Sequence, residues 1–171
     1  MRAASSLAEL LVDSVDHGAS VGFVWPFAVD DAAAWWETVT SDVRAGVVVL
    51  FAARASDRIV GTVQLRLAQY PNGRHRAEVA KLLVLSGVRR RGIARSLMEA
   101  AEEEARRLGR SLLVLDTATD AARRLYTSLG YSTAGVVPGY AADPDGSLRA
   151  TTIMWRRLVD DDGAATTMTG P

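Results

Sequence analysis

The fold of this chain is decided by one stretch, residues 78–108, which reads EVAKLLVLSGVRRRGIARSLMEAAEEEARRL. Its first part, up to Leu85, is apolar apart from Glu78 and Lys81, as is typical of a buried strand. From Gly92 onward apolar residues recur at helical spacing, and the pattern stops at a glycine, a common residue after a helix end. Arg89-Arg90-Arg91-Gly92-Ile93-Ala94, here named the basic turn, lies between the two parts. We therefore expect a strand, a turn and an amphipathic helix in immediate succession.

The basic turn has the chemistry of a phosphate site. Backbone N–H groups in the first turn of a helix lack partners within the helix, and the helix dipole places partial positive charge there. Three arginines add full charges, and Gly92 would let a ligand approach the backbone where a Cβ would block it. Taken alone, the turn predicts phosphate binding and no particular reaction.

The composition excludes several classes of protein. The chain has 171 residues, of which 49% are apolar, which suffices for one domain with a buried core. We expect residues 1–158 to form that domain and residues 159–171, acidic and then small and polar, to be a disordered tail. Basic and acidic residues number 20 each, so no excess charge favours a nucleic acid as partner.

Metal, thiol and membrane chemistry are also not expected. The absence of cysteine excludes disulfides, thiolate metal sites and cysteine catalysis. His17 and His75 lack metal-ligand spacing, so we expect no metal. Because the sequence shows no signal peptide and no apolar run long enough to span a bilayer, we expect a cytoplasmic protein without membrane association.

Two helices are expected before the first strand. The first covers residues 5–16, where Ser6 and Glu9 have the spacing of a capping box. The second covers residues 31–45, with Asp30 as its N-cap.

The loop between these helices, residues 17–26, allows two interpretations. It either packs over the edge of the core or forms a wall of a substrate pocket. Trp35 and Trp36 are adjacent in the second helix, so both cannot lie centrally on one narrow apolar stripe. One of the two is expected to face a ligand cleft.

The middle of the chain predicts a sheet of mixed direction. An apolar run at 47–53 and an alternating run at 59–69 form a hairpin, and the strand at 76–85 follows in antiparallel order. The helix of residues 92–108 connects that strand to a short apolar strand at 112–116. Such a crossover makes the two strands parallel neighbours.

The C-terminal part closes the sheet. We expect a short helix that begins at Thr119 or Asp120 and ends near Leu129, followed by strands at 131–137 and 148–158. The fold class is therefore α/β (α+β), with a mixed, mostly antiparallel sheet.

This order of elements resembles the GNAT superfamily of acetyl-CoA-dependent N-acetyltransferases. The loop pattern of that family is Gln or Arg, two residues, Gly, one residue, and Gly or Ala, and here Arg89, Gly92 and Ala94 fill it. The second family signature, a helix bearing a tyrosine and then Leu-Gly-Tyr, is matched by Tyr126 and Leu129-Gly130-Tyr131. The resemblance covers roughly residues 45–158. It implies a twisted sheet with helices on both faces and a splayed parallel strand pair.

A narrower likeness is to the tabtoxin-resistance acetyltransferases, which acetylate a small amino-acid-like β-lactam toxin. It rests on segments outside the cofactor loop. They are His17-Gly18-Ala19-Ser20-Val21-Gly22-Phe23, Pro71-Asn72-Gly73, Arg76-Ala77-Glu78-Val79, and Pro138-Gly139-Tyr140 with Pro144-Asp145-Gly146.

The superfamily resemblance implies acetyl-CoA as cosubstrate. The pantetheine would lie between the two parallel strands, where the N–H of Val84 or Leu85 would polarise the thioester carbonyl, and backbone N–H groups of residues 91–96 would hold the pyrophosphate. Thr119 stands where the family often has Asn, and its hydroxyl can still donate to the pantetheine. The expected cofactor-binding residues are Leu83, Val84, Leu85, Arg89, Arg90, Arg91, Gly92, Ile93, Ala94, Arg95, Ser96, Thr119 and Tyr126.

Three side chains are candidates for catalysis. Acetyl transfer to an amine requires that the ammonium lose a proton and that the thiolate gain one. Glu78 and Asp116 are the candidate bases, acting directly or through a water. The alternative is that Asp116 is a strand-end or helix-capping acid and Glu78 a surface residue. The family resemblance makes Tyr126 the general acid, with a core tyrosine as the alternative.

We therefore expect an N-acetyltransferase that transfers acetyl directly to the amine of a small molecule, such as an amino-acid-like antibiotic or toxin. The alternatives are acetylation of a protein N-terminus or lysine, and a non-catalytic acyl-CoA-binding module. The chain is expected to be a monomer or, if an exposed terminal strand pairs with a second copy, a homodimer.

Overall fold

A computed structural model describes residues 2–19, 21–143 and 145–158 of the chain. The predicted tail, residues 159–171, lies outside this part. The elements in chain order are α1 (Arg2–Asp16), α2 (Val29–Arg44), β1 (Val48–Ala55), β2 (Arg58–Leu67), the 3-10 turn η1 (Pro71–Gly73), β3 (Arg76–Val84), the 3-10 turn η2 (Ser86–Val88), α3 (Ile93–Arg107), β4 (Leu112–Thr117), α4 (Asp120–Ser128), β5 (Ser132–Ala142) and β6 (Leu148–Arg157).

The described strands form one six-stranded sheet in the order β1-β2-β3-β4-β6-β5. All neighbours are antiparallel except β3 and β4, which are parallel. The predicted mixed sheet, the β1–β2 hairpin and the parallel pair are thereby confirmed.

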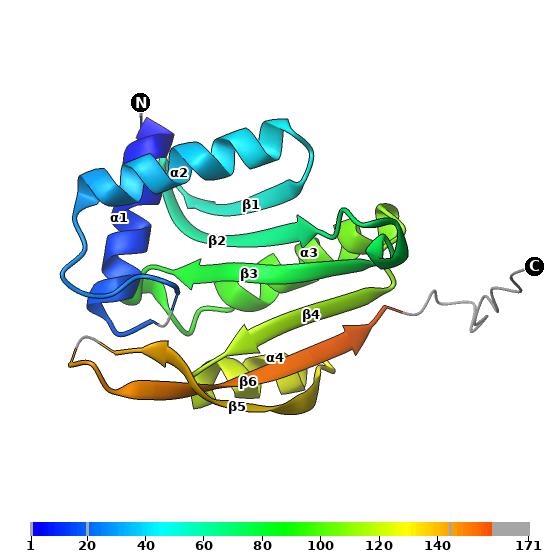
Figure 1. Cartoon of the computed structure of the whole chain (residues 1–171). Coiled ribbons are helices and arrows are strands. Elements are labelled where there is room, and N and C mark those ends of the chain that lie inside the picture. Colours follow the sequence, from blue (N-terminus) through cyan, green and yellow to red (C-terminus); the bar gives the residue numbers. More distant parts are fainter. Residues whose placement is uncertain (1, 20, 144, 159–171) are drawn as a thin grey trace, which may run out of the picture.

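Helices lie on both faces of this sheet (Figure 1). On one face, α1 and α2 pack on each other and over β1, β2 and β3, with Leu10, Leu11 and Trp36 in their buried core. On the other face, α3 and α4 cover a second core that includes Met98, Leu113 and Met154. α1 and α2 pack over β1, β2 and β3, so no described helix lies over the β4–β6–β5 half of that face (Figure 1).

The parallel pair separates soon after it forms. Arg76, Ala77 and Glu78 of β3 pair with residues 112–114 of β4, and no later residue of β3 does. Figure 1 shows the two strands diverging from this end. The remaining edge of β3, residues 79–84, therefore faces no strand.

Two contacts hold the elements that follow β3. The carboxylate of Asp13 in α1 accepts from the Ser86 N–H (2.8 Å) and hydroxyl (2.6 Å) just beyond the strand. A Cβ on Gly61 in β2 would lie 3.1 Å from Ile93 Cγ2 and 3.1 Å from Leu97 Cδ1, which is tighter than ordinary contact. Gly61 thus lets the first turn of α3 pack directly against the sheet.

The predicted helix caps of the first two helices are wrong. The helix α1 begins at Arg2, so Ser6 is a buried residue inside it, and Ser5 rather than Ser6 donates to Glu9 (3.3 Å). The N-cap of α2 is Ala28, whose side chain makes no capping bond. The misplacement has one cause: polar residues in the first turns of a helix resemble caps in sequence, and tertiary packing decides where the helix starts.

The other boundaries agree with the sequence within a few residues. Of the two predicted candidates for the N-cap of α4, the structure has Thr119, whose Oγ1 accepts from the Ala122 N–H at 3.3 Å. The largest difference is β5, predicted to end at 137, which runs to Ala142 because it continues to pair with β6 after an irregularity between Val137 and Ala141. Among the described residues, no helix has the length and apolar character needed to cross a membrane.

Candidate active site

A cleft of about 600 Å³ lies where β3 and β4 separate. Its lining comes from four places: the end of α1 with the loop up to Trp25, the middle of β3, the β4–α4 junction, and the β5–β6 hairpin. Glu78, Asp116, Thr119 and Tyr126, all predicted from sequence as site residues, line this one cleft. The structure therefore brings together residues that are up to 48 positions apart in the sequence.

The basic turn begins beside the exposed edge of β3. The Arg89 guanidinium donates from Nε to the Val84 carbonyl oxygen (3.1 Å), which fixes the start of the turn to the strand. Arg90 and Gly92 both have positive φ, at 64° and 82°. A Cβ at Gly92 would meet no atom within 4 Å, so the structure explains this glycine by its left-handed backbone, and the predicted close ligand approach remains a prediction.

The free donors of the turn are fewer than the sequence indicated. The Ser96 N–H donates to the Gly92 carbonyl oxygen (3.1 Å), so the unpaired N–H groups of α3 are those of Ile93, Ala94 and Arg95. The Arg95 guanidinium donates a hydrogen bond to the Ser128 hydroxyl oxygen (2.7 Å). Arg90 and Arg91 are exposed, and within the described part of the chain their guanidinium groups have no partner. Residues 90–95 thus present donors and two unpaired cations together.

One of the three predicted residues at the end of β3 has a backbone N–H that faces the space between β3 and β4. The Leu85 N–H donates to the Val60 carbonyl oxygen of β2 (2.9 Å), so it points away from the space between β3 and β4. Because N–H directions alternate along a strand, Leu83 also faces β2, whereas Val84 faces the open edge. Of the three predicted residues, only Val84 has its backbone donor on the correct side, and the side chains of Leu83 and Leu85 are in the core.

Glu78 and Asp116 lie on the same face of the sheet. Glu78 pairs with Val114, and Asp116 follows two residues later, about 7 Å further along β4. Both side chains are exposed to the cleft, and Asp116 accepts a hydrogen bond from the Thr151 hydroxyl (3.1 Å). This arrangement places two carboxylates in reach of one ligand.

Tyr126 reaches the cleft from α4. Its side chain is buried apart from 6% of its surface, and its hydroxyl makes no hydrogen bond to another described residue. Burial and the nearby Asp116 carboxylate raise the pKa of Tyr126 well above its usual value. The phenol is therefore a proton donor, not a phenolate, at neutral pH. The Thr119 hydroxyl accepts from Ala122 and keeps its own proton free to donate.

Sequence reasoning missed Lys81. The register of β2 and β3 shifts between Thr62 and Gln64, so that Lys81 and Leu82 both stand opposite Val63 in a β-bulge. Lys81 has φ of 52°, a left-handed conformation that costs a non-glycine residue about 1–3 kcal/mol. The buried Thr62 hydroxyl donates to the Lys81 carbonyl oxygen (3.2 Å) and holds the bulge. The one signal in the sequence that could have singled out Lys81 is that it is the only lysine of the chain.

The loop before α2 is a wall of the cleft, as one of the two sequence interpretations proposed. Val21, Phe23 and Trp25 line it, and Phe23 stacks on Phe27 with ring centroids 4.5 Å apart. Of the adjacent tryptophans, Trp36 is in the core, and Trp35 contacts Phe23 edge to face at 5.3 Å. Trp35 thus supports the wall from behind.

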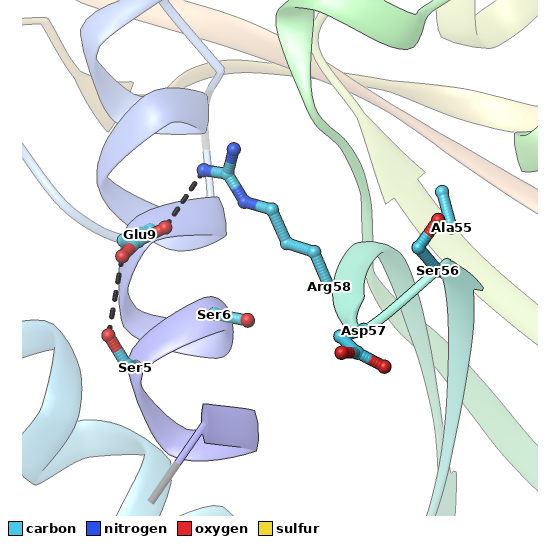
Figure 2. A pocket seen from close by; sticks show the side chains of 7 residues that line it. All are labelled: Ser5, Ser6, Glu9, Ala55, Ser56, Asp57 and Arg58. Carbon is cyan, nitrogen blue, oxygen red and sulfur yellow. Dashed lines mark hydrogen bonds and ion pairs between the residues drawn. The ribbon is translucent and has the colours of Figure 1, made fainter.

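A second pocket shares no residue with the cleft. Figure 2 shows it between α1 and the β1–β2 turn, where the Arg58 guanidinium bonds the Glu9 carboxylate (2.8 Å). Both side chains are largely exposed. The Ser5 hydroxyl also donates to Glu9 (3.3 Å), and the pocket contains none of the predicted site residues.

Comparison with known proteins agrees with this geometry. Three solved structures share the fold: ribosomal-protein-alanine N-acetyltransferase from Brucella melitensis (22% identity, TM-score 0.75, covering 91% of this chain and 94% of that one), yncA from Salmonella typhimurium with its cofactor acetyl-CoA (21%, 0.76, 92% and 89%), and a GNAT superfamily phosphinothricin acetyltransferase from Sinorhizobium meliloti in complex with acetyl-CoA (18%, 0.74, 91% and 84%). The model of the acetyltransferase (GNAT) family matches residues 8–131, well over half of the chain. The protein therefore belongs to the GNAT family of acetyltransferases.

Proposed function

We propose that this protein is an acetyl-CoA-dependent N-acetyltransferase that transfers acetyl directly to the amine of a small molecule. The observation that carries this proposal is the position of the open edge of β3. It adjoins the basic turn at one end, through the Arg89–Val84 contact, and the cleft with Glu78, Asp116 and Tyr126 at the other. A donor bound along that edge would span from a phosphate site to a set of acid–base groups.

The residues on the donor side fit acetyl-CoA, which would supply an acetyl thioester. The free N–H groups of Ile93, Ala94 and Arg95, with the guanidinium groups of Arg90 and Arg91, suit a pyrophosphate. The Val84 N–H is a hydrogen-bond donor on the unpaired edge of β3, so it is suited to polarise a carbonyl oxygen. Structures of two relatives of the same fold contain acetyl-CoA, which supports this choice of donor.

The acid–base groups suit transfer to an amine. In water an acceptor amine is present as an ammonium ion. Glu78 or Asp116 would take its proton directly or through a water. Tyr126, kept protonated by its raised pKa, would give a proton to the departing thiolate. The two carboxylates, from the sheet, and the phenol, from α4, line the same cleft.

The dimensions of the site favour a small acceptor. The loop carrying Phe23 and Trp25 covers the cleft from the α1 side, and the β5–β6 hairpin with Tyr140 and Arg149 borders it on the other. The likeness to enzymes for amino-acid-like toxins rests in part on segments in this loop and hairpin, which supports antibiotic or toxin resistance as the role. The fold does not choose between acceptors, since one relative of equal similarity is a ribosomal-protein-alanine N-acetyltransferase.

The proposal is tested by thiol release from acetyl-CoA in the presence of a panel of amines, with ribosomal and histone-tail peptides as a second panel. We expect turnover with small amines and a strong loss of turnover in Tyr126→Phe. Turnover confined to the peptides would contradict the choice of a small acceptor. Tight binding of acetyl-CoA without thiol release on either panel would show a non-catalytic acyl-CoA-binding module.

A further inference from the structure

The bulge in β3 turns Lys81 away from the core. Before the bulge, Ala77 and Val79 face the core under α3 and α4. After it, Leu83 and Leu85 face the core under α1 and α2, although they are also odd-numbered. Side chains alternate along a regular strand, so an unbulged β3 would place Lys81 with Ala77 and Val79. The bulge instead places it on the side of the cleft, where it is one of the lining residues.

The ammonium of Lys81 is held by aromatic rings and not by a carboxylate. Nζ lies 5.5 Å from the ring centroid of Trp35 and 5.9 Å from that of Phe23, within the range of cation–π attraction. A Cβ on Gly22 would lie 3.7 Å from Nζ, an ordinary contact distance, so this part of the loop lies next to the ammonium group. In the part of the chain that the structure describes, no carboxylate lies within ion-pair distance of Nζ.

Lys81 is therefore a half-buried cation that lacks an anion in contact. Burial lowers the pKa of Lys81, the charge of Arg66 lowers it further, and the charges of Asp116 and Glu78 raise it by less than burial lowers it. Partly buried charges are normally paired, because removal from water is unfavourable for them. A ligand anion in contact with Nζ would supply the missing partner.

The other cation of the cleft is already paired. Arg149 bonds Asp143 through both ends of its guanidinium group, Nη2 at 2.8 Å and Nε at 3.1 Å. Among the described lining residues this leaves Lys81 as the cation without a carboxylate partner. Glu78 and Asp116 face the same cleft as unneutralised acids. The cleft thus presents two carboxylates and one free ammonium, which is the complement of a zwitterion.

We propose that the acceptor is an amino acid or a close analogue, and that Lys81 binds its carboxylate while Glu78 and Asp116 receive its ammonium group. Phe23 and Trp35 form the wall that holds Lys81 in place and excludes water from this ion pair. The proposal rests on the proposed acetyltransferase function, and it names the substrate class and the residue that selects it.

The experiment compares amino acids with their methyl esters, which keep the amine and lose the negative charge. Thiol release from acetyl-CoA is measured for the common amino acids and the matching esters, with wild type and with Lys81→Met, whose side chain keeps the apolar stem. Arg58→Met removes one positive charge outside the cleft and serves as the matched control. Thermal unfolding of each variant reports whether it folds.

We expect wild type to prefer the best amino acid over its ester by about tenfold or more in kcat/KM, the range of a hydrogen bond to a charged group. Lys81→Met should abolish that preference, mainly by raising KM for the acid. Arg58→Met should keep the preference. Equal use of acid and ester by wild type, or a preference that survives in Lys81→Met, would overturn the proposal while the acetyltransferase function stands.

A binding measurement covers the case in which no amine is acetylated. With CoA present, amino acids and not their esters should raise the unfolding temperature of wild type, and Lys81→Met should lose this response. No thiol release from any amine together with that selective response would refute the proposed function and support the carboxylate site. Absence of both would overturn the inference as well.

Discussion

The basic turn and the bulge of β3 each present positive charge to a ligand site, and they are built in opposite ways. In the basic turn the cations and the N–H donors are consecutive residues, and Arg90 and Arg91 are exposed. At the bulge a single cation, Lys81, is half buried, and its surroundings come from Phe23, Trp35 and Thr62. The comparison teaches that local sequence builds the donor side of the site, whereas tertiary contacts build the acceptor side.

The largest expected effect tests whether the proton-transfer groups of the reaction lie in the cleft and not in the basic turn. Tyr126→Phe should lower kcat by about 100-fold or more, as loss of a general acid does, with little change in KM for acetyl-CoA. Since the pKa of Tyr126 is raised above its usual value, wild-type kcat should also show no loss from phenol ionisation up to about pH 10. Steady-state kinetics over a pH range measure both. Unaltered turnover in the variant would remove Tyr126 as the acid.

The next effect asks whether the two carboxylates act together. Glu78→Gln combined with Asp116→Asn should lower kcat between about tenfold and 100-fold, because no side chain then accepts the ammonium proton. Each single variant should lose less, since the other carboxylate remains in the same cleft. Steady-state kinetics of the two single variants and the double variant measure these losses. Unaltered turnover in the double variant would assign the base elsewhere.

A smaller effect isolates the basic turn. Arg90→Gln with Arg91→Gln should raise KM for acetyl-CoA about tenfold and leave kcat at saturating donor unchanged, because these groups contact phosphate and not the reacting atoms. Binding of CoA should become less sensitive to salt. Arg44→Gln with Arg157→Gln removes the same charge from exposed positions outside the turn and should change neither quantity. A fall in kcat would show that the basic turn also contributes to the chemical step, which the comparison assigns to the cleft.

The smallest effect tests the support of the bulge. Thr62→Val keeps the shape of the side chain and removes the hydrogen bond to the Lys81 carbonyl, so the free energy of unfolding should fall by about 1 kcal/mol. KM for the acceptor should rise a few-fold, while KM for acetyl-CoA stays constant. Thr40→Val is the control, since Thr40 makes a similar bond to the Trp36 carbonyl within α2. Denaturant unfolding measures the free energies of unfolding, and steady-state kinetics measures the two KM values. Equal effects of both variants on KM for the acceptor would show that the bulge does not support the acceptor site.

Most of the fold could be predicted because it depends on local patterns. The helical period of apolar residues ends at Gly46, where an apolar run and then an alternating run follow, and the crossover from β3 through α3 to β4 has only one common outcome. The predicted N-caps Ser6 and Asp30 are wrong because several polar residues near each helix start have the sequence character of a cap. Tertiary packing decides where each helix begins. Among the site residues, Tyr126, Asp116 and Glu78 were predicted and do line one cleft.

What the sequence by itself determined is the chemistry that consecutive residues can carry: the strand, the basic turn, the helix that follows, and the family they indicate. What only the tertiary structure decided is which of those groups are free. The Leu85 and Ser96 N–H groups are used by Val60 and Gly92, and Arg149 is used by Asp143. Lys81 turns toward the cleft because a one-residue bulge reverses the faces of β3. The physical reason is that hydrogen-bond partners and strand register are properties of residue pairs distant in sequence, which no single stretch specifies.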